Sequence, residues 1–350
     1  MNRRSQALAA LFSSLLAASI WANTATEPAP RTDDWWQKRQ ASFNTNVAAA
    51  GDQAAVLFIG DSITQGWEGE GKEVWSRYYS PRHAINLGIG GDRTQHVLWR
   101  LDNGNLKGLK PKAAVVMIGT NNSNGEDNTV AEIAEGVAAI VRQLRTALPD
   151  TRVLLLGIFP RGENPNPQRG KLAQINQILQ KLDDGRNVSY LDIGHRFLAA
   201  DGTLPKELMP DFLHLSPQGY QVWAEAIEPR LSALVGDTAI SPPATPTLTG
   251  DWVWTINGPD GQPVSAPLRL QQSGGTVSGK FAAGPDKWLD IEQGKVVGNR
   301  FSWVVKRTRP NGEIMVYEMT GQVSTDNITG QAKTQLDGNE IQSEWTARRN

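Results

Sequence analysis

Between residues 34 and 236 the sequence alternates short apolar runs with longer segments in which apolar residues recur every three or four positions. This alternation is typical of a parallel β-sheet covered by helices on both faces, because strands that are buried on both faces read as continuous apolar runs. The pattern predicts a three-layer α/β/α domain over 34–236. The expected strands are 54–59, 84–88, 113–118, 152–158 and 188–192.

Three of the segments between or after these runs have the period of amphipathic helices. Ser216 followed by Pro217 is a favourable start for the last one, since serine caps a helix and proline already has a helical φ. The repeating apolar positions are Val130, Ile133, Val137, Ile140, Val141, Leu144 and Leu148; Leu172, Ile175, Ile178, Leu179 and Leu182; and Val222, Ala226, Ile227, Leu231 and Leu234.

The chain changes character after Gly236. Residues 237–247 (DTAISPPATPT) read as a proline-rich linker in which a helix would start with difficulty. From 248 to 350 the sequence carries alternating stretches such as WVWTI, FSWVVK and IMVYEM between Gly, Asn and Asp turns. This pattern predicts a C-terminal all-β domain, a small or lipocalin-like barrel of antiparallel strands.

The first 22 residues join a basic start to an apolar stretch, which is typical of a secretory signal peptide cleaved after Ala22. The sequence therefore predicts a secreted or periplasmic protein. Residues 23–33 are polar and rich in Thr, Pro and Ala, and we expect them to be an unstructured spacer. The chain has no cysteine, so packed cores must supply its stability without disulfides.

The charge balance, 35 basic against 36 acidic residues, has no block of one sign and offers nothing that would attract nucleic acid or anionic lipid. No further segment reads as membrane-spanning. Four scattered histidines form no metal-ligand pattern. The glycines at 88–91 fail as a dinucleotide motif because Arg93 occupies its last glycine position. We expect no cofactor and no metal.

Polar residues follow the expected strands where each one ends, and in a parallel sheet these ends share one edge. A serine hydroxyl needs a base to accept its proton, and the base needs an acceptor that holds its tautomer. Ser62, His214 and Asp211 supply these three roles. The backbone amides of Ser62 and Gly91 and the Asn121 side chain could form an oxyanion hole for the attacked carbonyl.

Four blocks carry a resemblance: GDS at 60–62, the glycine loop at 88–91, GTNN at 119–122 and DxxH at 211–214. Through them, residues 54–232 resemble the SGNH or GDSL hydrolases. NLGIGGDRTQHVLWRL, FPRGENPNP and DFLHLSPQGY are most similar to the catalytic subunits of type I platelet-activating-factor acetylhydrolase. The resemblance implies a flavodoxin-like fold, Ser62 as nucleophile, Gly91 and Asn121 as oxyanion donors, and Asp211 with His214 as the rest of a triad.

Other interpretations remain open for several of these residues. Ser62 alone could be a helix cap, and Asn121 could bond its own turn. His83, His96 and His195 are alternative bases that we expect to be structural, and Asp192 and Asp201 compete with Asp211 on spacing. No role follows for Asp92, Arg93 or Arg161. The tryptophans of the C-terminal region could stack on sugars, although burial is their commoner fate: Trp252, Trp254, Trp288, Trp303 and Trp345.

The function that these observations favour is hydrolysis of a short acyl ester, acetyl above all, through an acyl-enzyme on serine. We expect the partner to be a small-molecule or carbohydrate ester, in which the alcohol is a carbohydrate or a small lipid. Activity should then rise with pH as histidine loses its proton. Two alternatives stay open: a carbohydrate-binding protein with an inactive hydrolase domain, and a phosphodiester or sulfate ester hydrolase.

Overall fold

The computed structural model describes residues 23–242, 247–257, 262–284, 287–336 and 338–350. The chain divides into two compact units, the first ending at Ile240 and the second starting at Ser241. The predicted signal peptide, residues 1–22, lies outside the described residues, as does 243–246 within the predicted linker.

The first unit is built on a five-stranded, wholly parallel sheet in the order β2-β1-β3-β4-β5. Gly60 at the end of β1 pairs with Gly88 of β2 and with Met117 of β3, so the loops after these strands start at one level of the sheet. The sheet confirms the prediction of a three-layer fold. Its strands are β1 (Val56–Gly60), β2 (Ile85–Gly88), β3 (Ala113–Met117), β4 (Arg152–Leu156) and β5 (Val188–Leu191).

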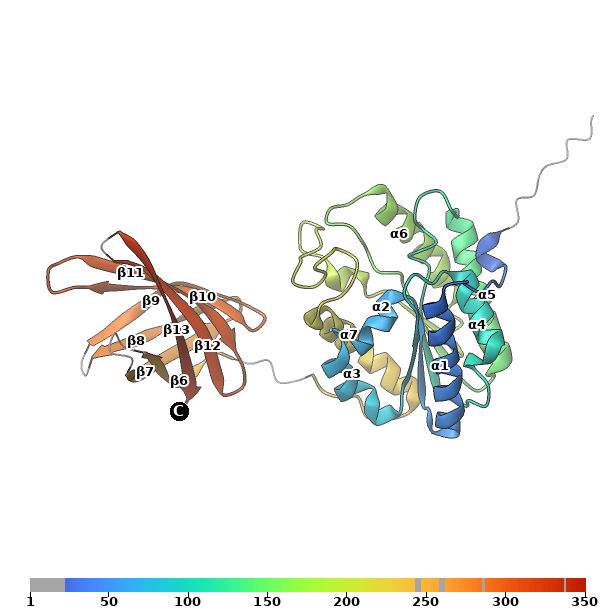
Figure 1. Cartoon of the computed structure of the whole chain (residues 1–350), viewed down its shortest axis with the longest axis horizontal. Coiled ribbons are helices and arrows are strands. Elements are labelled where there is room, and N and C mark those ends of the chain that lie inside the picture. Colours follow the sequence, from blue (N-terminus) through green and yellow to red (C-terminus); the bar gives the residue numbers. More distant parts are fainter. Residues whose placement is uncertain (1–22, 243–246, 258–261, 285–286, 337) are drawn as a thin grey trace, which may run out of the picture. The chain divides into compact units, whose positions relative to one another are not determined.

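Helices cover both faces of this sheet (Figure 1). Buried side chains of α1, α4, α5 and α6 form one apolar cluster, and those of α2, α3 and α7 belong to the other. The helices are α1 (Asp34–Ala50), α2 (Ser62–Gln65), α3 (Lys72–Tyr78), α4 (Thr94–Arg100), α5 (Val130–Ala147), α6 (Pro167–Leu179) and α7 (Pro217–Val235). Shorter helical turns are η1 (Thr24–Thr26), η2 (Gly51–Gln53), η3 (Gly66–Glu68), η4 (Ser80–Arg82), η5 (Leu101–Asn105), η6 (Gln180–Leu182) and η7 (Gly194–Phe197).

The caps of these helices follow from local sequence. Ser216 Oγ accepts a hydrogen bond from the Gly219 amide, and Pro217 is the first residue of α7, as predicted. Thr129 and Glu132 form a reciprocal capping box at the start of α5. Such caps satisfy amide groups that the first turn of a helix leaves without partners.

The segment 23–33, which we expected to be an unstructured spacer, packs against the rest of the first unit. That expectation was wrong. Ala25 is fully buried, and its carbonyl accepts a hydrogen bond of 2.7 Å from Thr94 Oγ1. The Ala29 amide donates to the Gln95 carbonyl. The segment has little apolar surface and is held mainly by polar contacts, which composition does not reveal.

The beginning of the expected linker 237–247 also belongs to the first unit. Arg82 is buried and makes paired hydrogen bonds of 2.7 Å to the carboxylate of Glu228, and it also contacts Asp237 at 2.8 Å. The Ile240 amide donates to Glu228 as well. Because a buried arginine needs partners for several donors, Asp237 is fixed beside α7 rather than left free.

The second unit is a closed barrel of eight antiparallel strands in the order β10-β11-β12-β13-β6-β7-β8-β9 (Figure 1). This confirms the predicted all-β domain. The strands are β6 (Gly250–Asn257), β7 (Pro263–Ser273), β8 (Thr276–Gly284), β9 (Lys287–Val297), β10 (Arg300–Thr308), β11 (Ile314–Val323), β12 (Asn327–Leu336) and β13 (Asn339–Arg349).

Aromatic side chains fill the described interior of the barrel. The Phe301 and Trp303 rings stack at 4.2 Å, and Trp345 lies 5.8 Å from Trp303. Trp252, Trp303 and Trp345 are almost completely buried. These three therefore pack as core residues and do not present a face to a sugar, whereas Trp254 and Trp288 are only partly buried.

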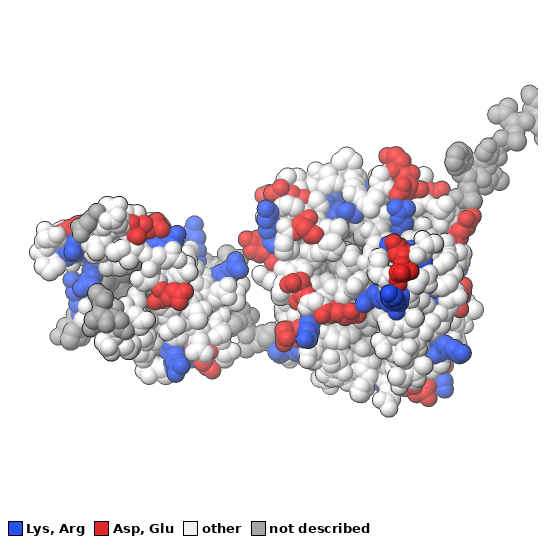
Figure 2. Space-filling view, in the orientation of Figure 1, with Lys and Arg blue, Asp and Glu red and all other residues white. Residues whose placement is uncertain are grey.

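Acidic and basic side chains are interspersed on the face shown in Figure 2, with no broad area of one sign. Among the described helices, none has the length and apolarity needed to cross a membrane. Within the same residues, no three His, Asp or Glu side chains gather in a way that could hold a metal ion.

Candidate active site

Ser62 lies at the start of a short helix directly after the buried strand β1. The Asp61 side chain caps this helix by accepting a hydrogen bond of 3.0 Å from the Ile63 amide. At the preceding residue, a Cβ on Gly60 would lie 2.1 Å from Thr64 Oγ1 and 2.5 Å from the Met117 carbonyl oxygen. Only glycine allows this close approach, so the strand-to-helix turn is tight and Ser62 is held at the edge of the sheet.

Ser62, His214 and Asp211 form a continuous chain of hydrogen bonds. Ser62 Oγ lies 2.9 Å from His214 Nε2, and His214 Nδ1 lies 2.7 Å from Asp211 Oδ2. Since an ionised carboxylate can only accept, the proton on the ring belongs at Nδ1, which leaves Nε2 as an acceptor for the serine hydroxyl. The arrangement has the geometry required of a nucleophile, its base and an orienting acid.

The loop that carries Asp211 and His214 is folded back on itself. Phe212 between them has a φ of +60°, a left-handed conformation that is unusual for a bulky residue, and its carbonyl accepts from the Gly162 amide. This turn lets Asp211 Oδ1 accept from the amides of Leu213 and His214 at 3.1 and 2.7 Å. Burial alone would raise the pKa of Asp211, but the hydrogen bonds from the His214 ring and these amides outweigh it and lower that pKa.

The glycine loop that carries Gly91, one of the predicted oxyanion donors, passes beside Ser62. Gly90 lies next to the serine, since a Cβ built on it would lie 3.8 Å from Ser62 Cβ. Within the part of the chain that the structure describes, the amides of Ser62 and Gly91 donate no hydrogen bond. Asn121 Nδ2 donates to the Asp92 carbonyl at 2.9 Å. Asn121 thus braces the neighbouring loop rather than its own turn, and its second amide hydrogen stays available.

Comparison with known proteins shows the family to which the chain belongs. The model of the GDSL-like lipase/acylhydrolase family matches residues 58–222. Platelet-activating factor acetylhydrolase IB subunit alpha2 of Rattus norvegicus is 42% identical over 207 residues, which are 59% of this chain and 87% of that protein. The chain belongs to the GDSL-like lipase/acylhydrolase family. It is a carboxylic ester hydrolase, as the sequence predicted.

One further relative and one solved structure are also similar to this chain. The alpha1 subunit of the same acetylhydrolase from Homo sapiens is 40% identical over 216 residues, 61% of this chain and 91% of that protein. A solved GDSL-like lipase from Bacteroides thetaiotaomicron is 20% identical and covers 56% of this chain and 97% of its own, with a TM-score of 0.47. The family model matches within the first unit, so family membership is shown for that unit.

The alternative histidines of this GDSL hydrolase have other environments. His83 has a φ of +48° in the turn before β2. His96 Nδ1 accepts a hydrogen bond of 3.0 Å from the Arg93 amide, and burial together with Arg31, Arg93 and Arg100 lowers its pKa to about 4. His195 lies in η7, after β5. Of the four histidines, His214 is the one hydrogen-bonded to Ser62.

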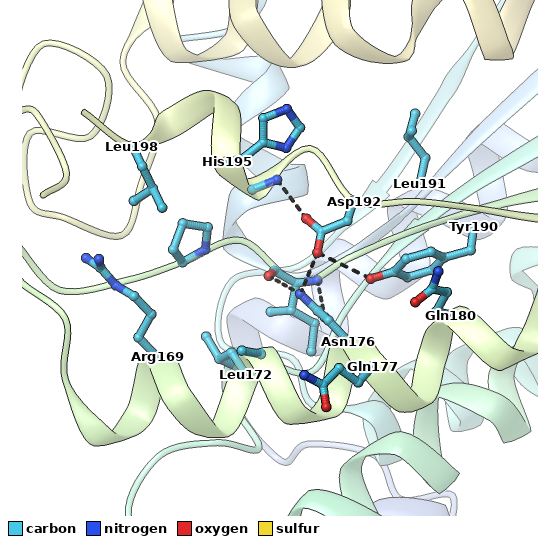
Figure 3. A pocket seen from close by; sticks show the side chains of 14 residues that line it. Arg169, Leu172, Asn176, Gln177, Gln180, Tyr190, Leu191, Asp192, His195 and Leu198 are labelled. Atoms are coloured by element: carbon cyan, nitrogen blue, oxygen red, sulfur yellow. Dashed lines mark hydrogen bonds between the residues drawn. The ribbon is translucent and has the colours of Figure 1, made fainter. Parts of the chain in front are cut away.

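The competing carboxylates are also engaged elsewhere. Asp201 accepts hydrogen bonds from the amide and hydroxyl of Thr203. Asp192 accepts from the Gly194 amide at 2.8 Å and from Tyr190 and Asn176 at 3.4 Å (Figure 3). Asp211 therefore remains the carboxylate beside the serine's base.

Asp192 and His195 line a half-open pocket of about 620 Å³ between α6 and the end of β5 (Figure 3). Leu172, Leu191 and Leu198 form part of its apolar wall. Neither Ser62, His214 nor Asp211 lines this pocket. The pocket is therefore separate from the serine, histidine and aspartate that form the candidate active site.

The sequence did not reveal the part played by Asp92. Its carboxylate is fully buried and accepts 2.7 Å and 2.8 Å hydrogen bonds from Trp36 Nε1 and Arg100 Nε. Burial raises the pKa of Asp92, although Arg100 and Trp36 oppose this effect. Because Asn121 also holds the Asp92 carbonyl, this residue anchors the glycine loop beside the serine. The only signal in the sequence was its place directly after that loop.

Asp61 is a second buried acid next to the serine. Burial raises its pKa to about 7, with a further contribution from Asp92. Its Oδ2 atom has no hydrogen-bond partner among the described residues, while Oδ1 caps α2. A neutral carboxyl is favoured at such a site because an isolated buried charge is costly.

Arg161, for which the sequence indicated no role, approaches the site from the segment after β4. Its Nη1 donates to Asn124 Oδ1 at 3.0 Å and to Thr120 at 3.3 Å. Burial lowers its pKa, while the charges of Asp61 and Asp211 oppose that change. Arg161 thereby connects the loop after β3 to the acidic side of the site.

Proposed function

We propose that the chain hydrolyses short acyl esters, acetyl esters above all, through an acyl-enzyme on Ser62. The observation that carries this proposal is the hydrogen-bonded chain from Ser62 Oγ through His214 to Asp211. The preference for acetyl is supported by the relatives, which are named acetylhydrolases. The alcohol is proposed to be a carbohydrate or a small lipid.

In the proposed reaction Ser62 Oγ bonds to the acyl carbon while its proton passes to His214 Nε2. The carbonyl oxygen becomes negative and is stabilised by the amides of Ser62 and Gly91 and by Asn121. The bond to the alcohol oxygen then breaks, and that oxygen takes the proton from His214. Water attacks the acyl-enzyme by the same route, with His214 again accepting and returning a proton, and the carboxylic acid leaves.

A panel of nitrophenyl esters of graded acyl length tests the reaction and the acyl preference. The full chain and Ser62→Ala are assayed side by side on acetate, butyrate and octanoate. We expect turnover to be highest on acetate and to fall at least about 10⁴-fold in the alanine variant. Equal rates for the two proteins would refute the role of Ser62, and a maximum at octanoate would refute the acetyl preference.

The alcohol is identified with natural-type esters. Acetylated xylo- or gluco-oligosaccharides and a short-chain acetyl phospholipid are supplied at equal concentration, and released acetate is measured. Turnover of one class alone assigns the substrate to it. If acetate is released from nitrophenyl acetate only, neither proposed alcohol is correct.

We further propose that residues 1–22 direct export and are removed after Ala22. The support is the basic and apolar pattern of that segment. Mass measurement of the chain recovered from the periplasm or medium of a bacterial host should give a protein that starts at Asn23. A chain that keeps residues 1–22 and stays in the cytoplasm would contradict this proposal.

A further inference from the structure

The peptide unit between Gly90 and Gly91 lies next to two side chains that belong to different parts of the chain. Gly90 lies next to Ser62, as shown above, whereas a Cβ on Gly91 would lie 2.9 Å from Arg31 Nη1. Gly91 also has a φ of +76°, which favours glycine. The unit is therefore held between the serine and the N-terminal segment 23–33.

Arg31 makes a direct bond to this peptide unit. Its Nη1 donates to the Gly90 carbonyl oxygen at 2.8 Å. The described chain contains no cis peptide bond, so the Gly90 C=O and the Gly91 N–H point in opposite directions. Fixing the carbonyl on Arg31 consequently makes the Gly91 N–H point away from Arg31. That N–H donates no hydrogen bond to any described residue.

We propose that Arg31 is a positioning residue of the oxyanion hole: it holds the Gly90–Gly91 peptide so that the Gly91 N–H is aimed at the oxyanion formed on the substrate. This inference rests on the proposed function, in which Gly91 is an oxyanion donor. The guanidinium also polarises the peptide, because a charged donor on the carbonyl oxygen strengthens the dipole of the N–H at the other end.

Arg31 is itself held in place before any substrate arrives. Its Nε donates to Asp33 Oδ2 at 3.0 Å, and its guanidinium lies 4.9 Å from the centre of the Trp35 ring. The segment around it is anchored through Ala25 and Ala29 on α4. A rigid support of this kind is what an oxyanion donor needs, since it must not reorganise during the reaction.

Arg39, in α1, provides a matched control because it contacts the same glycine loop. Its Nε donates to the Gly88 carbonyl at 2.9 Å, and its other donors contact Glu68. The N–H of that peptide unit belongs to Ile89 and already donates to the Gly60 carbonyl at 3.3 Å. Arg39 thus braces the same glycine loop but cannot direct a free N–H toward the substrate.

The test compares Arg31→Ala and Arg39→Ala in the full chain, with nitrophenyl acetate as substrate. We expect kcat of Arg31→Ala to fall about 10- to 100-fold with KM changed less than about twofold, because the loss is felt only in the transition state. Arg39→Ala should keep kcat within about twofold. Arg31→Lys, which keeps a charged donor, should recover part of the lost kcat, and millimolar guanidinium chloride should raise kcat of Arg31→Ala alone.

A purely structural role for Arg31 predicts different results. Equal kcat losses at positions 31 and 39, a change in KM alone, or no response to guanidinium would each overturn the inference. If an alanine variant fails to fold, Arg31→Gln and Arg39→Gln replace the pair, and the same inequality in kcat is required. Should the wild type lack esterase activity, or Ser62→Ala retain it, the proposed function fails; an active wild type, an inactive Ser62→Ala and a fully active Arg31→Ala refute only this inference.

Discussion

The carboxyl edge of the parallel sheet and the interior of the barrel both bring together side chains from distant parts of the chain. The sheet edge gathers polar side chains, whereas the barrel interior gathers aromatic ones. At the sheet edge Ser62, Asp92 and Asn121 lie in the loops that follow β1, β2 and β3, and Asn121 bonds the Asp92 carbonyl. The interior of the barrel is instead filled by aromatic rings such as Phe301, Trp303 and Trp345.

The difference follows from how each sheet disposes of its faces. Strands β1, β3 and β4 are buried on both faces, so polar groups can gather only where these strands end. A closed barrel instead turns alternate residues inward, where they must fill the space. The comparison predicts that changes at the sheet edge alter turnover, whereas changes inside the barrel alter stability.

Removing an interior ring should give the largest effect, and only on stability. Trp345 is 2% exposed and packs against Phe281, Phe301 and Trp303. Trp345→Ala should lower the free energy of unfolding of the barrel by about 3–5 kcal/mol, measured by urea denaturation, while kcat on nitrophenyl acetate stays unchanged. Ile314→Ala, at a residue 60% exposed, is the control and should change neither. A loss of turnover in Trp345→Ala would break the comparison.

Removing a hydrogen-bond donor at the sheet edge should instead lower turnover and leave stability almost unchanged. Asn121→Ala is expected to lower kcat about 10²- to 10³-fold, because one donor to the oxyanion is lost. Its melting temperature should change much less, and the comparison is made by steady-state kinetics alongside thermal denaturation. Asn124→Ala, which removes a contact of Arg161 in the same loop, controls for loosening of that loop. If both variants lose equal activity, the loop and not the Asn121 amide is responsible.

Taken per pH unit, the smallest effect is expected in the pH dependence of stability at Asp61. Because its pKa in the folded protein is raised to about 7, the folded chain keeps a proton that the unfolded chain releases above its ordinary pKa of 3.8. Between these two pKa values the Asp61 carboxyl therefore makes the free energy of unfolding fall as pH rises, by up to about 1.4 kcal/mol per pH unit. Above the pKa of the folded protein it contributes no further slope.

Asp61→Asn keeps an acceptor for the cap of α2 and should remove this slope. Urea denaturation of both proteins at pH 5, 6, 7 and 8 measures it, with Asp52→Asn, at an exposed carboxylate, as the control. Parallel curves for wild type and Asp61→Asn would show that the buried acid does not titrate in this range.

The sequence predicted the sheet well because its signals are local. Apolar runs marked all five strands to within two residues at either end, and Ser216 with Pro217 marked the start of α7. It also predicted that Ser62, His214 and Asp211 would meet, since the ends of parallel strands converge. Their catalytic roles stay predictions.

What the sequence could not predict depends on long-range polar contacts. Residues 23–33 have the composition of a spacer, because isolated hydrogen bonds and not an apolar pattern hold them in place. Examples are the bond from Thr94 to the Ala25 carbonyl and the bond from Arg31 to the Gly90 carbonyl. Asp92 likewise has a structural part only through Trp36 and Arg100. Bonds of this kind have no periodicity, and a composition-based boundary misses them, as it missed the contact of Asp237 with Arg82.

Covalent labelling of Ser62 tests the central claim most directly. The full chain is treated with a nitrophenyl alkylphosphonate, which reacts with activated serine hydroxyls, and its peptides are analysed by mass spectrometry. One phosphonyl group is expected on Ser62, with loss of esterase activity in proportion, and no label on His214→Ala, which lacks the base that activates the serine. Stoichiometric labelling of another serine, or full inactivation with Ser62 unmodified, would contradict the account.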